Sequence, residues 1–410
     1  MSEIGSRARS EAPWDTPRWL QLVAMLGLVL CMLSLLLGCQ QLATDNPPPA
    51  EARRDPIQNL LDEAVAKGLP GAVVYVEGPN RRFLGASGLA DRDTGTPLSP
   101  ESLFHTASNG KTYVAAAALL LVDQGRLSLD RPIQQQLPES LLRRLDLAPE
   151  VSLRHLLSHT SGVYNYSDNP AYTQAVMAAP DRYWSVEELL ELARGQPAKF
   201  AAGQGWSYSN TAYLLVGQLL DHQLGQPHQR FLQERILDPL HLQHTYPLPN
   251  TKAEAGLVHG YLDVDGNGDL EDARPLALTQ GFADGGIVST AEDLGRFFKA
   301  LVRPSGELAP SVWREMLGNL RPSQPQRRYG LGIREFSTPH GLAYGHGGRL
   351  PGYASEVFYF PVQDVTVVVL ANGTDGPLEA LVEHLTEQVI AFALPAPHIA
   401  SRSHSGAHEQ

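Results

Sequence analysis

Short apolar segments typical of β-strands lie towards both ends of the chain, whereas the middle has the pattern of helices. Turn residues such as Gly78-Pro79-Asn80 separate these segments, which favours strands. We expect strands at residues 71–76, 82–90, 329–335, 341–346, 354–360 and 365–370. Residues from about 151 to 240 have the pattern of helical segments broken by glycine and proline. Strands at both ends predict one sheet with a helical lobe inserted between its halves.

Three helices can be bounded from the signals at their ends. The first runs from residue 56 to about 67, with Gly68 just beyond it. The second, at residues 108–124, is rich in alanine and leucine and is followed by Gly125. The third runs from about 377 to 391. The expected domain organisation is a folded domain at 56–392, its helical lobe at about 108–280, and a loose polar tail at 393–410.

The N-terminus has the pattern of a targeting segment. An apolar run at residues 19–37 follows several arginines and is about as long as the 20 residues that cross a bilayer. Leu36-Leu37-Gly38-Cys39 then resembles the bacterial lipobox, in which the cysteine is lipidated and becomes the mature N-terminus. The resemblance implies a signal peptide at 1–38, a lipidated Cys39 and a tether at 39–55, with Gln40 indicating the outer membrane of the bacterial envelope, facing the periplasm. An uncleaved signal anchor is the alternative.

Composition narrows the classes of partner and of chemistry. The chain has 410 residues, of which 43% are hydrophobic and 19% charged, as in a globular protein. A formal net charge of −12 argues against nucleic acid as a partner and against electrostatic binding to an anionic membrane. The two cysteines are Cys31, inside the expected signal peptide, and Cys39. The mature domain therefore has no cysteine for disulfides, thiol catalysis or thiolate metal ligands.

The clearest candidate for chemistry is the pair Ser108 and Lys111. It forms the only Ser-x-x-Lys in the sequence, and the chain has five lysines in all. The serine opens a predicted helix, where backbone N–H groups favour a developing negative charge. The lysine lies one turn later on the same face and can take the proton that a serine must lose to become a nucleophile. A capping serine followed by a solvent-exposed lysine would show the same pattern.

Three ordered motifs resemble the serine β-lactamase and penicillin-binding protein family, in its class C-like branch. They are Ser108-Asn109-Gly110-Lys111 within the segment 103–130, Tyr208-Ser209-Asn210, and His346-Gly347-Gly348. The segments 154–163 and 285–298 also resemble the family, and the resemblance covers about 56–392. It implies an α+β fold in which an antiparallel sheet is flanked by helices and carries an inserted helical lobe. His404-Ser405-Gly406 fits the third motif's letters better, but no strand surrounds it.

The resemblance assigns catalytic roles. Ser108 would attack a carbonyl carbon, and Lys111 and Tyr208 would share its proton, which Tyr208 would pass to the leaving group. The oxyanion would lie between the backbone N–H of Ser108 and that of Arg349. These roles describe acyl transfer without a cofactor.

Substrate-binding roles follow for Asn210, which would hold the acyl side, and for His346, Gly347, Gly348 and Arg349, which would line the cleft. In the family the middle residue of the third motif is usually Thr or Ser and helps to bind a substrate carboxylate. Gly347 removes that hydrogen bond, worth about 1.5–3 kcal/mol. Either Arg349 supplies a replacement cation or the substrate lacks the carboxylate, and the second is simpler.

We therefore expect a serine hydrolase that acts on a small-molecule or peptide ester or amide. A carboxylesterase is ahead of a D-amino-acid peptidase, and a β-lactamase is third. The alternative from another class is a catalytically inactive protein of the same fold that binds peptidoglycan or a partner. The sequence does not define the oligomeric state.

Two further patterns have features of metal sites. His155 and His159 are four residues apart but lack the glutamate of a His-Glu-x-x-His site, and the family resemblance makes their segment structural. Residues 263–269 resemble the first half of a calcium-binding EF-hand loop, but position 12 is Arg274. A polar surface hairpin is favoured over a calcium site there, and no metal is expected.

Overall fold

The computed structural model describes residues 54–142, 147–264, 266–303 and 308–394. The chain divides into the units Met1–Arg54 and Asp55–Gln410, and the fold described below belongs to the second. The expected signal peptide, Cys39 and nearly all of the tether and tail lie outside the described residues. No helix in the described ranges combines the length and apolar character needed to cross a membrane.

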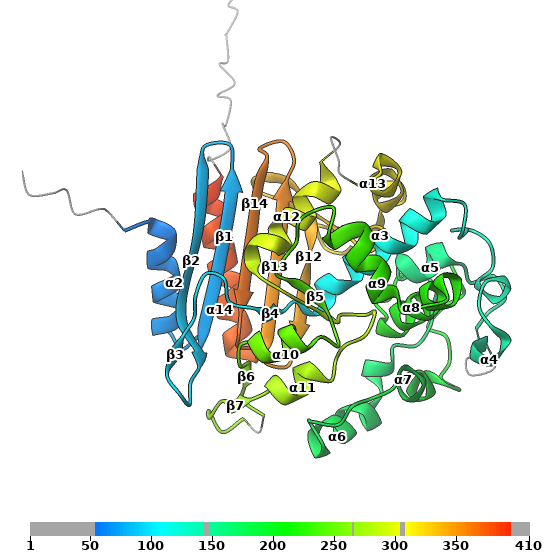
Figure 1. Ribbon diagram of the computed structural model, residues 1–410, viewed down its shortest axis with the longest axis horizontal. Coiled ribbons are helices and arrows are strands. Elements are labelled where there is room, and N and C mark those ends of the chain that lie inside the picture. The colour runs from blue at the N-terminus through cyan, green and yellow to red at the C-terminus, as the bar shows by residue number, and fades with distance from the viewer. Residues whose placement is uncertain (1–53, 143–146, 265, 304–307, 395–410) are drawn as a thin grey trace, which may run out of the picture. The chain divides into compact units, whose positions relative to one another are not determined.

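A nine-stranded sheet forms the centre of the fold, and each neighbouring pair of strands is antiparallel (Figure 1). Strands from the beginning of the chain lie directly beside strands from its end, because β1 pairs with both β2 and β14. The strands in sheet order are β3 (Thr96–Pro97), β2 (Arg81–Asp91), β1 (Gly71–Gly78), β14 (Val365–Ala371), β13 (Tyr353–Phe360), β12 (Gly341–Leu350), β11 (Arg334–Thr338), β10 (Arg327–Tyr329) and β9 (Arg321–Gln324).

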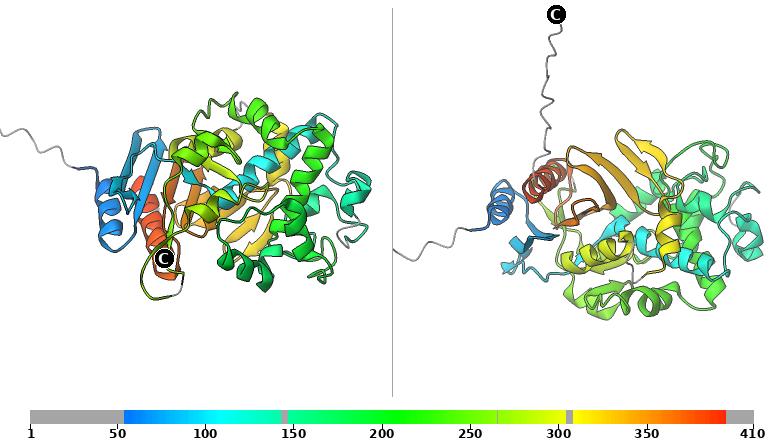
Figure 2. Two further views of the ribbon diagram at one scale, coloured as in Figure 1. Left: turned by 60° about the horizontal axis from the view of Figure 1, so that its bottom comes forward. Right: turned by 90° about the horizontal axis from the view of Figure 1, so that it is seen from above.

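Helices cover both faces of this sheet, which explains why its central strands are almost continuously apolar (Figure 2). Successive side chains of a strand point to opposite faces. Val74 and Val369 therefore pack beneath α2 (Pro56–Ala66) and α14 (Gly376–Ala393). Tyr75 and Val368 belong to the larger core on the other face, beneath α12 (Ala291–Val302).

Several of the remaining helices lie beyond the β12 side of the sheet, around α3 (Gly110–Asp123) (Figure 1). Most residues of α3 are buried, as expected for a helix that is apolar on all sides. The other α-helices are α4 (Glu139–Leu142), α5 (Leu153–Leu157), α6 (Pro170–Ala178), α7 (Val186–Ala193), α8 (Asn210–Leu224), α9 (His228–Leu232), α10 (Thr251–Gly256), α11 (Arg274–Leu278) and α13 (Pro310–Leu317). Two small antiparallel sheets complete the fold: β4 (Phe104–His105), β8 (Ile287–Ser289) and β5 (Thr245–Pro247) in one, and β6 (Tyr261–Leu262) with β7 (Glu271–Asp272) in the other.

The predicted α+β fold is confirmed, but one predicted strand is wrong. The segment 329–335 is not continuous: β10 ends at Tyr329 and β11 begins at Arg334. Between them the chain passes tightly over other backbone. A Cβ on Gly330 would lie 2.0 Å from the carbonyl oxygen of Met316, and Gly332 has φ +80°. The four residues 330–333 are therefore a close-packed crossing and not part of the sheet.

Candidate active site

Ser108 lies in a tight turn between β4 and α3. The turn is the 3₁₀ helix η1 (Ala107–Asn109), and α3 begins only at Gly110, so the expected helix start at Ser108 is wrong by two residues. Ala107 has φ +48°, a left-handed conformation that is strained for a residue with a side chain and is often found at functional sites. Its N–H donates to His105 Nδ1 at 3.0 Å, which helps to hold this conformation.

Hydrogen bonds attach the turn to β13, and close packing brings it against β12. Asn109 Nδ2 donates to Ser355 Oγ at 2.8 Å, and Ser355 Oγ donates to the carbonyl oxygen of Thr106 at 2.7 Å. β12 comes so close that a Cβ on Gly348 would lie 2.3 Å from the same Thr106 oxygen. Gly348 therefore permits the contact between the third motif and the turn that carries Ser108.

Lys111 is fully buried and points back to the serine. Its Nζ donates to Ser108 Oγ at 3.2 Å and also donates to the carbonyl oxygen of Asp284, in the turn before β8. The ring centroids of Tyr208 and Tyr213 lie 4.9 Å and 5.6 Å from Nζ. The structure thus brings the first and second motifs together around one amine.

Tyr208 precedes α8, and its hydroxyl is buried with no hydrogen-bond partner among the described residues. The ring packs against that of His159 at a tilt of 37°, with 4.2 Å between the centroids. His159 Nδ1 accepts the N–H of Ser209 at 3.1 Å, and burial lowers the pKa of His159 well below its ordinary value. His159 is therefore a neutral support beneath Tyr208.

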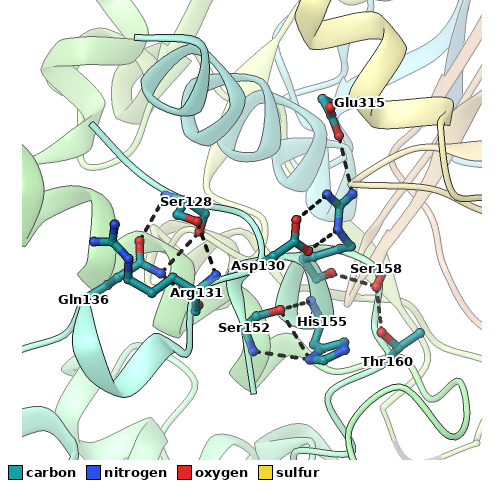
Figure 3. Close-up of polar contacts among 10 residues, drawn as sticks. Ser128, Asp130, Arg131, Gln136, Ser152, His155, Ser158, Thr160 and Glu315 are labelled. Carbon is teal, nitrogen blue, oxygen red and sulfur yellow. Dashed lines mark hydrogen bonds and ion pairs between the residues drawn. The ribbon is translucent and has the colours of Figure 1, made fainter. Parts of the chain in front are cut away.

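The segment before His159 is held by side chains that Figure 3 shows. Ser152 and His155 cap the start of α5 reciprocally, which occupies His155 Nδ1. Arg154 of the same helix pairs with Asp130 at 2.6 Å and with Glu315 at 3.4 Å. His155 thus contributes to the helix cap, whereas His159 supports the site.

In the third motif, the side chain of His346 is fully buried. Its Nδ1 donates to the carbonyl oxygen of Gly347 at 2.6 Å, and its Nε2 accepts the hydroxyl of Tyr329 at 3.0 Å. Burial lowers the pKa of His346 well below its ordinary value, in agreement with one donating and one accepting nitrogen. Its ring lies 6.4 Å from that of Tyr208.

Gly347 and Arg349 face the opposite side of β12 from Gly348. A Cβ on Gly347 would lie 2.9 Å from a carboxylate oxygen of Glu356. The Arg349 guanidinium pairs with Glu356 at 2.7 Å and lies 3.7 Å from Glu379 of α14. Acidic partners therefore hold the side chain of Arg349 on the α14 side, and its expected role as a replacement cation stays a prediction.

A cavity of about 450 Å³ lies in front of Ser108. Asn210 is in its wall, where Asn210 Nδ2 donates to Ser167 Oγ at 3.2 Å. Arg349 also borders the cavity. A larger hollow of about 780 Å³, against α14, includes Gly347 and Arg349 but not Ser108.

Two charged residues of the site were missed by sequence reasoning. Asp284 borders the cavity, and its Oδ2 accepts the hydroxyl of Tyr166 at 2.8 Å. The guanidinium carbon of Arg334 lies 5.8 Å from the Tyr208 ring, and its buried Nε has no hydrogen-bond partner among the described residues. The segment 285–298, which resembles the β-lactamase and penicillin-binding protein family, begins one residue after Asp284. It is the sequence signal nearest to Asp284.

The calcium-like segment forms the loop of the β6–β7 hairpin. The Asp263 carboxylate accepts backbone N–H groups of Gly266 at 2.7 Å and Gly268 at 2.9 Å, and Asn267 Oδ1 accepts that of Asp269 at 2.6 Å. These oxygens shape the turn itself, as in Asx turns.

Known proteins show similarity over most of the described residues. The family described as Beta-lactamase matches residues 57–390. Protein flp of Staphylococcus aureus (strain N315) is 24% identical over 344 residues, 82% of this chain and 66% of that protein. Esterase EstB of Burkholderia gladioli is 35% identical over 189 residues, 44% of this chain and 48% of the esterase.

The crystal structure of D-amino acid amidase from Ochrobactrum anthropi SV3 complexed with L-phenylalanine superimposes with a TM-score of 0.70 and 26% identity. That match covers 82% of this chain and 97% of the amidase. By contrast, the chain spans less than two thirds of the length of the two curated relatives above.

Proposed function

The chain belongs to the β-lactamase family, and on that premise we propose that it is a serine hydrolase that forms a covalent acyl-enzyme on Ser108 with ester or amide substrates. The observation that carries the proposal is the 3.2 Å hydrogen bond between Ser108 Oγ and the Nζ of fully buried Lys111. A serine with a buried amine at this distance, open to a cavity, has the arrangement of an activated nucleophile.

In the proposed reaction, Ser108 Oγ bonds to the substrate's carbonyl carbon while its proton passes to Lys111 and Tyr208. The bond from that carbon to the leaving group then breaks, and the leaving group takes the proton. Water hydrolyses the resulting ester of Ser108 and restores the enzyme. Positioned proton transfer of this kind contributes about 10²–10⁴-fold to the rate.

The backbone N–H groups of Ser108 and Arg349 are the proposed oxyanion donors, since both residues border the cavity. Asn210 is proposed to hold the acyl side of the substrate from its place in the wall. His346 and Gly348 act as positioning residues. His346 packs near Tyr208, and Gly348 leaves room for the turn that carries Ser108.

Esters and amides without a carboxylate on the leaving group are the proposed substrates. Gly347 has no hydroxyl to bind such a carboxylate, and acidic residues hold the side chain of Arg349 on the α14 side. The similarity to an esterase and to a D-amino acid amidase supports the same two substrate classes. A carboxylesterase or D-amino-acid peptidase is therefore favoured over a β-lactamase.

Anchoring at the cell envelope is proposed from the sequence. Cys39 after the apolar run would carry the lipid and tether the hydrolase to the outer membrane, facing the periplasm. Incorporation of labelled palmitate into the full chain, lost in Cys39→Ala, is the expected result. Incorporation that persists in this variant would contradict the assignment.

A fluorophosphonate probe tests the proposed nucleophile, because it reacts with activated serines. We expect one adduct on the wild-type protein, located at Ser108 by peptide mass spectrometry, and none on Ser108→Ala. Ser167→Ala is the matched control, since Ser167 borders the same cavity and should leave labelling intact. A wild-type protein that stays unlabelled would favour the inactive binding protein instead.

A further inference from the structure

The cavity beside Ser108 is suited in size and lining to a ring-sized apolar group. Its volume of about 450 Å³ falls in the range of small-molecule sites. Tyr166 and Tyr172 meet edge to face at 5.1 Å in its wall, and Val176 and Leu276 also border it. An apolar wall of this kind would accommodate an aromatic or aliphatic substituent on the acyl side of a substrate.

The carboxylate of Asp284 is unusual in an apolar wall unless a ligand binds it. The hydroxyl of Tyr166 is its hydrogen-bond donor, and no Lys, Arg or His among the described residues forms an ion pair with the carboxylate. Burial raises the pKa of Asp284, as expected for an acid in poorly solvated surroundings. The charge of Lys111, whose Nζ donates to the Asp284 backbone carbonyl, partly offsets this rise in the pKa. A carboxylate has acceptor capacity beyond the one Tyr166 hydroxyl, so its place beside the nucleophile points to a further donor from a ligand.

The other charges around the cavity have the same sign. Glu271 and Asp272 of β7 border it together with Asp284. Arg349 is the one cationic residue in the described lining, and its guanidinium is 2.7 Å from Glu356. Asp272 is hydrogen-bonded to His259 Nδ1 at 2.8 Å, which leaves Asp284 and Glu271 as the acids of the lining without a basic partner among the described residues. A lining of this charge attracts cations and repels anions.

We propose that the acyl part of the substrate carries a positive charge, such as the free amino group of an aminoacyl ester or amide, and that Asp284 binds this group. The backbone carbonyl of Asp284 accepts from Lys111 Nζ, so the carboxylate belongs to a residue that touches the catalytic amine. An amino group near the reacting carbonyl would therefore lie close to this residue. This inference rests on the proposed acyl-enzyme function and specifies its substrate.

Two esters that differ only in the amino group test the inference on the wild-type protein. Phenylalanine methyl ester, as separate D and L forms, is compared with the methyl ester of 3-phenylpropionic acid. A charge-assisted hydrogen bond corresponds to about 10- to 150-fold, so at least one aminoacyl form should have kcat/KM larger by that factor. Equal or faster hydrolysis of the ester without the amino group would overturn the inference.

Asp284→Asn provides the second arm, because it keeps the backbone carbonyl and an acceptor for Tyr166. We expect the ratio of the two kcat/KM values to fall at least tenfold. Asp168→Asn is the matched control: Asp168 lies in the same 3₁₀ helix η3 (Tyr166–Asp168) as Tyr166, and its carboxylate pairs with Lys199 at 2.8 Å. The ratio should stay within about twofold there. An unchanged ratio in Asp284→Asn would refute the role of the carboxylate.

Fluorophosphonate labelling separates failure of this inference from failure of the proposed function. A protein that is labelled at Ser108 but does not prefer the aminoacyl ester, or turns over neither ester, retains an activated serine and contradicts only the inference. Absence of labelling would contradict both the proposed function and this inference.

Discussion

Replacing Tyr208 by phenylalanine should raise stability and lower activity at the same time. The hydroxyl of Tyr208 is buried and finds no hydrogen-bond partner among the described residues. A buried polar group without a partner costs about 1–3 kcal/mol, and Phe removes that cost while keeping the ring. The ring contacts with His159 and Lys111 would remain.

The change in melting temperature follows from the size of the folded unit. Unfolding entropy is about 2.1 cal/mol/K per residue, or about 0.7 kcal/mol/K for roughly 340 residues. A gain of about 1–3 kcal/mol therefore corresponds to an increase of about 1–4 °C in Tm. Loss of proton transfer should lower kcat/KM by about 10²–10⁴-fold.

Tyr213→Phe is the matched control because its ring also lies near Lys111. Its hydroxyl, however, donates to the carbonyl oxygen of Leu157 at 2.9 Å. Loss of that bond should lower stability by about 1 kcal/mol, with a kcat/KM within about threefold of wild type. Calorimetry and ester hydrolysis would be measured on both variants. If Tyr208→Phe lowered Tm as much as Tyr213→Phe, the Tyr208 hydroxyl would have a partner and the reasoning would be refuted.

Three further substitutions test separate parts of the site. Lys111→Met should lower the rate of ester hydrolysis by about 10²–10⁴-fold. Its Tm should change little, because an apolar side chain replaces a buried amine, and a large drop in Tm would contradict this reasoning. Gly348→Ala should lower the free energy of unfolding by about 1–3 kcal/mol, measured by chemical denaturation, because its Cβ would lie 2.3 Å from the Thr106 oxygen. Gly347→Ala should lower it less, because its Cβ meets the flexible carboxylate of Glu356. Equal losses in the two variants would count against the packing argument. Asp284→Asn should raise Tm at pH 8, because burial raises the folded-state pKa of Asp284, so ionisation opposes folding above that pKa. The gain should disappear as the pH falls below the unfolded-state pKa of about 3.9, and a gain that grew in acid would refute the sign.

The sheet was predictable because its strands are local patterns. The segments 71–76, 354–360 and 365–370 are short apolar runs between turn residues, and each is a strand in the structure. The segment 329–335 has a similar residue pattern, but its strand is interrupted between Tyr329 and Arg334, where Gly330 and Gly332 lie. Their close contacts are with Met316 and Ala115, which no local pattern could reveal.

The same distinction applies to the site. Ser108 and Lys111 are three residues apart, so their proximity was predictable from helical spacing. Asp284, whose carbonyl holds Lys111, comes 173 residues later, and only the folded chain brings it to the amine. The direction of the Arg349 side chain also depends on which face of β12 each position occupies, and Glu356 on the neighbouring strand shows that face.

Strand alternation connects the third motif to the proposed substrate charge. His346 and Gly348 lie on the side of β12 that meets Tyr208 and the Ser108 turn, and His346 is uncharged there. Arg349 carries the charge, but its side chain is on the α14 side. The strand therefore brings no free positive charge to the cavity, while Asp284 brings a negative one. A carboxylate on the substrate would lack a partner at the third motif, whereas an amino group on the acyl side would meet Asp284, so both features favour the same uncharged or cationic substrates.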